Sequence, residues 1–111
     1  MNRNHQFRGM TALITGASKG IGAATALALG TRGAFTLIHY NKGAEEANQL
    51  LKKLRDAGGE GELLQSDLSC SEGIHKFIQA LGQSGRPIDI LINNAGSLVK
   101  RTPFLEFTED L

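Results

Sequence analysis

The sequence lacks the features that are typical of disulfide-linked, zinc-binding, secreted or membrane-spanning proteins. Its one cysteine, Cys70, excludes an internal disulfide, and no spacing of cysteine and histidine is typical of a zinc site. The polar residues 1–8 lack the apolar middle of a signal peptide, and no apolar run approaches the length of a membrane span. We therefore expect a cytoplasmic protein that holds no metal and has no membrane partner.

The charges of the chain are nearly balanced. It has 12 basic and 11 acidic residues and a formal net charge of +1, which argues against a general attraction to nucleic acid. A chain of 111 residues suffices for one domain with one modest core. These properties favour a protein that binds a small molecule and no nucleic acid.

Two kinds of apolar pattern alternate along the chain. Short runs of strand length cover residues 10–15, 34–40, 62–66 and 88–92, and the segments between them carry apolar residues at helical spacing. Strands that alternate with helices are typical of right-handed crossover units in a parallel sheet. The sequence thus predicts an α/β fold with a doubly wound parallel sheet of four strands.

Each of the three predicted helices has an apolar face. Ser69 and Glu72 have the spacing in which two side chains satisfy each other's backbone amides at the start of the third helix. The fourth strand, residues 88–92, is apolar enough to be covered on both faces of the sheet. The predicted faces consist of Ile21, Ala24, Ala28 and Leu29 in the first helix, Ala47, Leu50, Leu51 and Leu54 in the second, and Ile74, Phe77, Ile78 and Leu81 in the third.

The glycine-rich residues 15–22, which read TGASKGIG, lie between the first strand and the first helix. A diphosphate binds where backbone amides at a helix N-terminus point at it and no side chain obstructs it. Gly16 would permit the tight turn, Gly20 the approach to the phosphates, and Gly22 the close packing of helix on strand. The segment therefore predicts bare amides from Gly16 to Gly22 around a diphosphate, and the alternative is a plain turn. A P-loop has lysine followed by serine or threonine directly after its last glycine. Since Ala23 follows Gly22, the segment is not a P-loop.

Together with Asn93-Asn94-Ala95-Gly96 after the fourth strand, this segment resembles the two cofactor signatures of the classical short-chain dehydrogenase/reductase (SDR) family. The resemblance extends from about Gly9 to the end of the chain and is nearest to the reductases of 3-oxoacyl carrier proteins. It implies a Rossmann fold and an oxidoreductase that transfers a hydride between a nicotinamide dinucleotide and a carbonyl or hydroxyl substrate.

The end of the second strand indicates which dinucleotide the site prefers. NAD sites of this type usually place a carboxylate there, which would repel a 2'-phosphate. In this chain residues 39–42 read HYNK, and the first acid is Glu45. Since Lys19 and Lys42 could lie near a 2'-phosphate, we expect NADP(H) in preference to NAD(H). The alternative is that both are ordinary solvated lysines.

The resemblance implies further contacts with the dinucleotide. Asp67 would hydrogen-bond the adenine amino group beside Leu68, and a turn-forming or helix-capping aspartate is the alternative. Asn94 would chiefly stabilise the sheet, and Gly96 would let the ribose approach the backbone. The complete set of predicted cofactor-binding residues is Gly16, Ser18, Lys19, Gly20, Ile21, Gly22, Tyr40, Asn41, Lys42, Asp67, Leu68, Asn94, Ala95 and Gly96.

The residues that would transfer a proton are missing from the sequence. The resemblance implies a tyrosine that delivers or takes the proton and a lysine four positions later that lowers its pKa. Tyr40 is the only tyrosine, and Ala44 stands four positions after it, so we predict no catalytic residue. We expect His5, His39 and His75 to be solvated or structural.

We therefore interpret residues 1–111 as a truncated NAD(P)-binding Rossmann domain of a parent enzyme that acts on a small-molecule substrate and forms a homo-oligomer. The sequence ends within a helix predicted to begin at Thr108. Alone, the chain would be inactive, and its fourth strand would form an apolar edge prone to association. The alternative is a non-catalytic module that binds NADP(H) or a protein partner.

Overall fold

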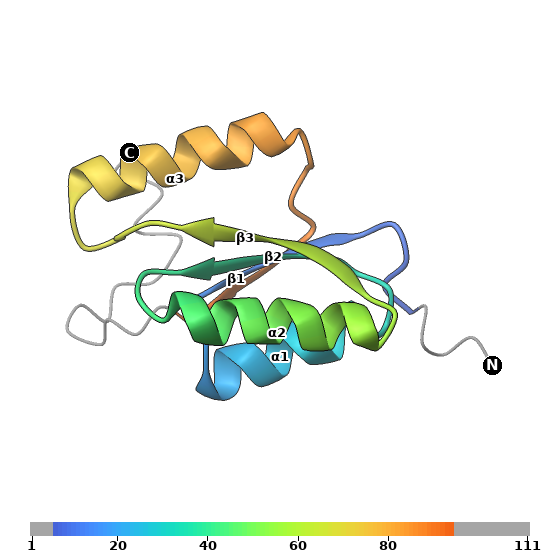
Figure 1. The fold of residues 1–111 in the computed structure, drawn as a ribbon. Coiled ribbons are helices and arrows are strands. Elements are labelled where there is room, and N and C mark those ends of the chain that lie inside the picture. The colour runs from blue at the N-terminus through green and yellow to red at the C-terminus, as the bar shows by residue number, and fades with distance from the viewer. Residues whose placement is uncertain (1–5, 95–111) are drawn as a thin grey trace.

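Strands and helices alternate along the chain, as the sequence predicts. The computed structural model describes residues 6–94, and its elements are β1 (Thr11–Thr15), α1 (Gly20–Gly30), β2 (Phe35–Tyr40), α2 (Ala44–Asp56), β3 (Glu60–Gln65), α3 (Ser71–Ser84) and β4 (Ile90–Asn93). The strands lie in the order β3-β2-β1-β4, and every neighbouring pair is parallel. Helices α1 and α2 lie on one face of the sheet and α3 lies on the other (Figure 1). The α/β class and the doubly wound parallel sheet are confirmed.

The register of the strands brings their carboxyl ends to one edge of the sheet. Thr15 at the end of β1 pairs with Asn93 at the end of β4, and Tyr40 at the end of β2 pairs with Gln65 at the end of β3. The loops that follow parallel strands all leave from this carboxyl edge, which is where open α/β sheets bind ligands. Most of the predicted site residues lie in these loops.

The main core lies between the sheet and the helices α1 and α2. Strand β1 is buried along its whole length, and Ile38 of β2 and Leu54 of α2 have no exposed surface. Helix α2 also buries Ala47 and Leu50, and Leu51 is half-buried, so its predicted apolar face is confirmed.

The predicted apolar face of α1 is wrong. The helix buries Gly22, Ala26 and Gly30, whereas Ile21 is 77% exposed. A Cβ at Gly30 would meet Leu54 Cδ1 of α2, so the absence of a side chain lets the two helices approach each other. The buried face therefore consists of the smallest residues and not of the large apolar ones. Of the other residues of the predicted face, Ala24 and Ala28 are exposed and Leu29 is half-buried.

The second face of the sheet is less covered in the part of the chain that the structure describes. Phe77 of α3 contacts the ring of His39 in β2, but Ile78 is 52% exposed and Gly73 is the buried residue of the helix. The residues of β4 are half-buried or exposed, so the expectation that this strand is covered on both faces is wrong. The reason is that the described helices pack chiefly on β1, β2 and β3, whereas the chief contacts of β4 are with β1.

Helix α3 does not begin with the predicted pair of reciprocal caps. Its N-cap residue is Cys70, and no side chain caps the helix. Ser69 instead donates hydrogen bonds from its amide and its hydroxyl to Asp67 Oδ1, at 2.9 and 2.6 Å. Short polar side chains readily form such local turns. Asp67, and not Glu72 as expected, therefore accepts the hydrogen bond from the backbone amide of Ser69.

Candidate dinucleotide-binding site

Two glycines shape the turn between β1 and α1. Gly16 and Gly20 have φ angles of +62° and +67°, in the left-handed region that side chains disfavour. Helix α1 then begins after Lys19, its N-cap residue, without a side-chain cap and with no acidic residue in the first turn. The N-terminus of a helix carries unpaired amides and a partial positive charge. The turn thus brings to the carboxyl edge of the sheet a helix N-terminus of the kind that can hold an anion.

Gly22 and Asn94 hold this turn against the end of β4. A Cβ at Gly22 would lie 2.5 Å from Asn94 Nδ2 and 2.7 Å from Gly16 O, so a larger residue would force a shift. The side-chain amide of Asn94 donates to Gly16 O at 3.1 Å, and its backbone amide donates to Thr15 Oγ1 at 2.9 Å. Asn94 therefore connects the end of β4 to the end of β1 and to the glycine turn.

His39, the next-to-last residue of β2, belongs to the site although the sequence analysis did not assign it. Its side chain is 2% exposed; Nδ1 accepts from Gly16 N at 3.0 Å, and Nε2 lies 3.0 Å from Ser66 O. Because an amide N–H only donates and a carbonyl only accepts, the imidazole is neutral with its proton on Nε2. Burial lowers the pKa of His39 below its ordinary value of 6.5, and the hydrogen bond to Ser66 offsets part of that effect. A histidine within the buried run of β2 is the signal that could have revealed this role, since buried polar groups need partners.

The first two amides of the turn are not bare. Gly16 N donates to His39 Nδ1, and Ala17 N donates to His39 O at 2.8 Å. The prediction that all amides from Gly16 to Gly22 face a diphosphate is therefore wrong for these two, because β2 already satisfies them. The part of the turn left for an anion begins at Ser18 and continues into the first turn of α1.

The loop after β2 lies beside the glycine turn. A Cβ at Gly43, the N-cap residue of α2, would lie 3.2 Å from Ser18 Oγ. Tyr40 is half-buried at the end of β2, and Asn41 and Lys42 are exposed in the loop. The structure thus brings together the predicted residues of the turn and those at the end of β2.

Asp67 follows β3 at the same edge of the sheet, and its carboxylate forms a local turn. The hydrogen bonds that Oδ1 accepts from Ser69, first the one from the hydroxyl and then the one from the amide, lower the pKa of Asp67. The positive charge of Lys42 contributes a smaller effect in the same direction. The turn-forming alternative is therefore present in the structure. Leu68, next to Asp67, is half-buried.

Lys19 and Lys42 are both exposed, and neither takes part in the ion pairs found within residues 6–94. Both ammonium groups are therefore available to an anionic ligand. Ile21 is exposed in the first turn of α1, beside the glycine turn. Ala95 and Gly96 lie outside the described residues.

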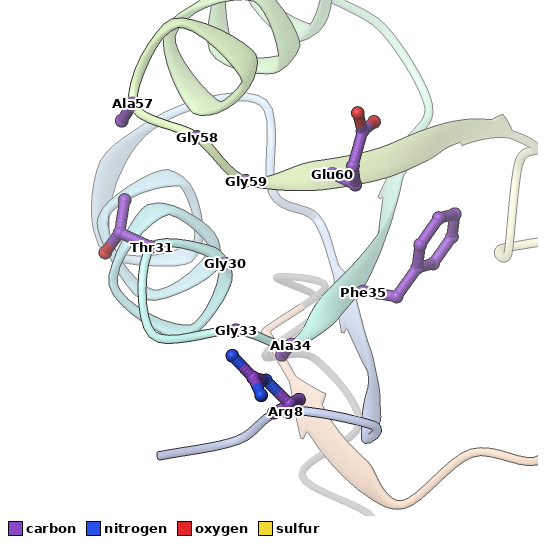
Figure 2. Close-up of a pocket in the computed structure, with 10 residues that line it drawn as sticks. All are labelled: Arg8, Gly30, Thr31, Gly33, Ala34, Phe35, Ala57, Gly58, Gly59 and Glu60. Atoms are coloured by element: carbon purple, nitrogen blue, oxygen red, sulfur yellow. The ribbon is translucent and has the colours of Figure 1, made fainter. Parts of the chain in front are cut away.

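A hollow lies at the opposite edge of the sheet. It has a volume of about 460 Å³ and is lined by the ends of α1 and α2 and the beginnings of β2 and β3. Figure 2 shows Arg8 beside Gly33 and Ala34, and Gly58 and Gly59 along the connection from α2 to β3. Because the glycine turn follows the carboxyl end of β1, this hollow is separate from the candidate site.

The carboxyl edge carries a smaller hollow. It has a volume of about 220 Å³, and its lining includes Ser66 and Asp67 after β3 and Lys76 of α3.

Within residues 6–94, no three histidine, cysteine, aspartate or glutamate side chains are grouped so that they could hold a metal ion. None of the helices in the same range is long and apolar enough to cross a membrane.

Residues 10–111 match the family described as short chain dehydrogenase. The short-chain dehydrogenase/reductase homolog YusS of Bacillus subtilis is 34% identical over 103 residues, which cover 90% of this chain and 94% of YusS. Other curated relatives are longer, and the chain spans between 33% and 37% of their length.

Solved structures of this family resemble the chain in sequence and in fold. RhlG of Pseudomonas aeruginosa, in an NADP active-site complex, is 35% identical with a TM-score of 0.76, over 87% of this chain and 38% of RhlG. The 3-oxoacyl (acyl-carrier-protein) reductase of Agrobacterium tumefaciens C58 with NADP bound is 34% identical with a TM-score of 0.70, over 87% of this chain and 39% of that protein. The fold, the glycine turn and these similarities lead to one conclusion: the chain belongs to the short-chain dehydrogenase/reductase family of NAD(P)-dependent oxidoreductases.

Proposed function

We propose that residues 1–111 form the NADP(H)-binding domain of an oxidoreductase that transfers a hydride between NADP(H) and the carbonyl or hydroxyl group of a small molecule. The observation that carries this proposal is the N-terminus of α1, which has no side-chain cap and no acid in its first turn. By contrast, the first turns of α2 and α3 contain Glu45, Glu46 and Glu72, which would repel a phosphate. Among the described helices, α1 is therefore the one suited to a diphosphate.

In this proposal the diphosphate lies on the amides from Ser18 into the first turn of α1. Gly20 lets the backbone approach the phosphates, because it adopts a φ of +67° and leaves free the open space that a Cβ would enter. Gly16 forms the turn that leads to this point, and Gly22 keeps α1 close to β1. The exposed side chain of Ile21 adds an apolar contact at the helix start.

The adenosine end would lie over the loops that follow β2 and β3. Lys42 and Lys19 would bind the 2'-phosphate, since both are exposed and no carboxylate stands at the end of β2. The NADP complexes of RhlG and of the Agrobacterium reductase support this preference. The remaining proposed contacts are those of Tyr40, Asn41, Asp67, Leu68, Ala95 and Gly96.

When bound, the dinucleotide supplies or accepts the hydride. The chain's own residues bind and orient it, and we assign proton transfer to none of them because the one tyrosine, Tyr40, lies at the end of β2 without a lysine four positions later. The 111-residue chain is thus proposed to bind NADP(H) without catalysing hydride transfer by itself.

A second candidate is a nucleotide-binding module without a catalytic role. The match to YusS, of which the chain covers 94%, favours it because the two are of similar length. The DNA downstream of the codon for Leu111 separates the two candidates. An in-frame Tyr-x-x-x-Lys pattern supports the oxidoreductase, and a stop codon with no such pattern supports the module.

Calorimetric titration of the 111-residue chain with NADP⁺ and NAD⁺ tests the proposed cofactor. We expect tighter binding of NADP⁺, and in Lys42→Ala a loss of about tenfold or more in NADP⁺ affinity alone, since a hydrogen bond to a charged group contributes about 1.5–3 kcal/mol. The matched control, Lys53→Ala, removes a lysine from the last turn of α2 and should change neither affinity. Tighter binding of NAD⁺, or no binding of either dinucleotide, contradicts the proposal.

A further inference from the structure

The two segments proposed to hold the ends of the dinucleotide are not neighbours in the sheet. The glycine turn follows β1 and the Asp67 loop follows β3, and β2 lies between these two strands. His39 of β2 links them, because its Nδ1 accepts from Gly16 N while its Nε2 donates to Ser66 O, one residue before Asp67. Both hydrogen bonds are 3.0 Å long, so one buried imidazole connects both segments.

The surroundings of His39 keep its ring in place and uncharged. Phe77 of α3 packs edge-on against the imidazole, with 5.1 Å between ring centroids and an interplanar angle of 65°. The groups that contact the ring from the turn, from the loop after β3 and from α3 are Gly16, Ser66 and Phe77, and none of them is charged or titratable. The carboxylate of Asp67, which follows Ser66, is engaged in its own turn. An imidazolium would lose the bond from Gly16, because a protonated Nδ1 only donates.

We propose that His39 is a positioning residue of the dinucleotide site: its Nδ1 holds the glycine turn in place for the diphosphate, and its bond to Ser66 and its contact with Phe77 fix the orientation of the ring. The inference rests on the proposed function, because it concerns the same site. His39 is buried and acts on the site through Gly16, because its Nδ1 accepts from the Gly16 amide while the bond to Ser66 orients the ring. Protonation of the imidazole breaks the link to Gly16 and therefore weakens dinucleotide binding.

Two substitutions separate the two links. Asparagine places an acceptor oxygen near the position of Nδ1, and glutamine places a donor nitrogen near that of Nε2, so His39→Asn retains the bond from Gly16 and His39→Gln retains the bond to Ser66. At about pH 8 we expect His39→Asn to keep its NADP⁺ affinity within about threefold and His39→Gln to lose about tenfold or more, because the charge of the diphosphate lies on the turn. His75→Asn and His75→Gln on the exposed surface of α3 are the matched controls, and neither should change the affinity.

The pH dependence of NADP⁺ binding, measured over the pH range in which far-UV circular dichroism shows both chains to be folded, separates positioning from a loss of stability. Between about pH 8 and pH 5, the wild-type chain should bind more weakly as the pH falls, and His39→Asn should show a smaller decrease. The 2'-phosphate also titrates in this range, but it does so equally in both titrations. The difference between the two profiles therefore reports the protonation of His39.

The outcomes distinguish this inference from the proposed function. Equal losses of affinity in His39→Asn and His39→Gln, or the same pH profile in His39→Asn and the wild type, overturn the inference and leave the proposed function in place. A wild-type chain that binds no NADP⁺ overturns both. If neither variant folds, the pKa of His39 in the wild-type chain is measured by ¹⁵N NMR with and without saturating NADP⁺. Since protonation weakens binding, linkage requires bound NADP⁺ to lower this pKa. A pKa that NADP⁺ does not change overturns the inference.

Discussion

Gly22→Ala is expected to destabilise the chain, even though alanine favours helices more than glycine does. A Cβ at Gly22 would lie 2.7 Å from Gly16 O and 3.0 Å from Ala17 Cα. Both are backbone atoms, so the turn or the start of α1 must move to make room. The Cβ would also lie 2.5 Å from Asn94 Nδ2, which now donates to Gly16 O. The substitution therefore disturbs the contact between α1, the turn and the end of β4.

The expected magnitude follows from three opposing effects. Alanine in a helix gains about 1 kcal/mol over glycine. Overpacking costs about 1–3 kcal/mol, and loss of the hydrogen bond from Asn94 to Gly16 costs about 1 kcal/mol more. The net expectation is a decrease of about 1–3 kcal/mol in the free energy of unfolding.

Urea denaturation of the 111-residue chain measures this change. The matched control is Gly82→Ala, because Gly82 is also helical and nothing lies within 4 Å of the place of its Cβ. The control should gain about 0.5–1 kcal/mol. A Gly22→Ala chain as stable as the wild type, with the control behaving as expected, would refute the packing argument. It would show that α1 and the turn can move apart without a decrease in the free energy of unfolding.

Three further predictions concern the core, the surface and the pH dependence. Leu54→Ala should lower the free energy of unfolding by about 2–5 kcal/mol in urea denaturation, since Leu54 is fully buried, and a loss below about 1 kcal/mol would contradict this. Lys52→Ala breaks the exposed ion pair with Asp56 and should change stability by no more than about 0.5 kcal/mol, with a larger loss counting against the reasoning. The pKa of His39 is lowered in the folded state, so its stabilising contribution is complete above pH 6.5 and is lost as the pH falls below that value. Urea denaturation at a series of pH values should show this decrease in the wild type and not in His39→Asn.

Much of the fold could be predicted because it depends on local patterns. The spacing of Ala47, Leu50 and Leu54 predicted α2 and its buried face correctly. The prediction failed for α1, since a search for large apolar residues selects Ile21 and passes over the buried Gly22. Only tertiary contacts explain why small residues face inward there: Gly30 lies against Leu54 of α2, and Gly22 lies against Gly16 and Asn94.

The part of the candidate site that depends on local patterns could also be predicted. The glycine turn was evident because Gly16 and Gly20 are required by the local backbone, whatever packs around them. The role of His39 was not evident, because its partners lie 23 and 27 residues away in the chain. The hydrogen bonds of Asp67 to Ser69 are local, but the sequence offered a cap with Glu72 as an equally local alternative.

The sequence by itself determined the alternation of strands and helices, the place of the glycine turn and the absence of a tyrosine and lysine pair four positions apart. These depend on residue types and short spacings, which do not change with the surroundings. The tertiary structure decided which amides of the turn remain for an anion, because His39 reaches it from β2 and Asn94 from the end of β4. Side chains meet in this way only when a parallel sheet brings the ends of distant strands to one edge.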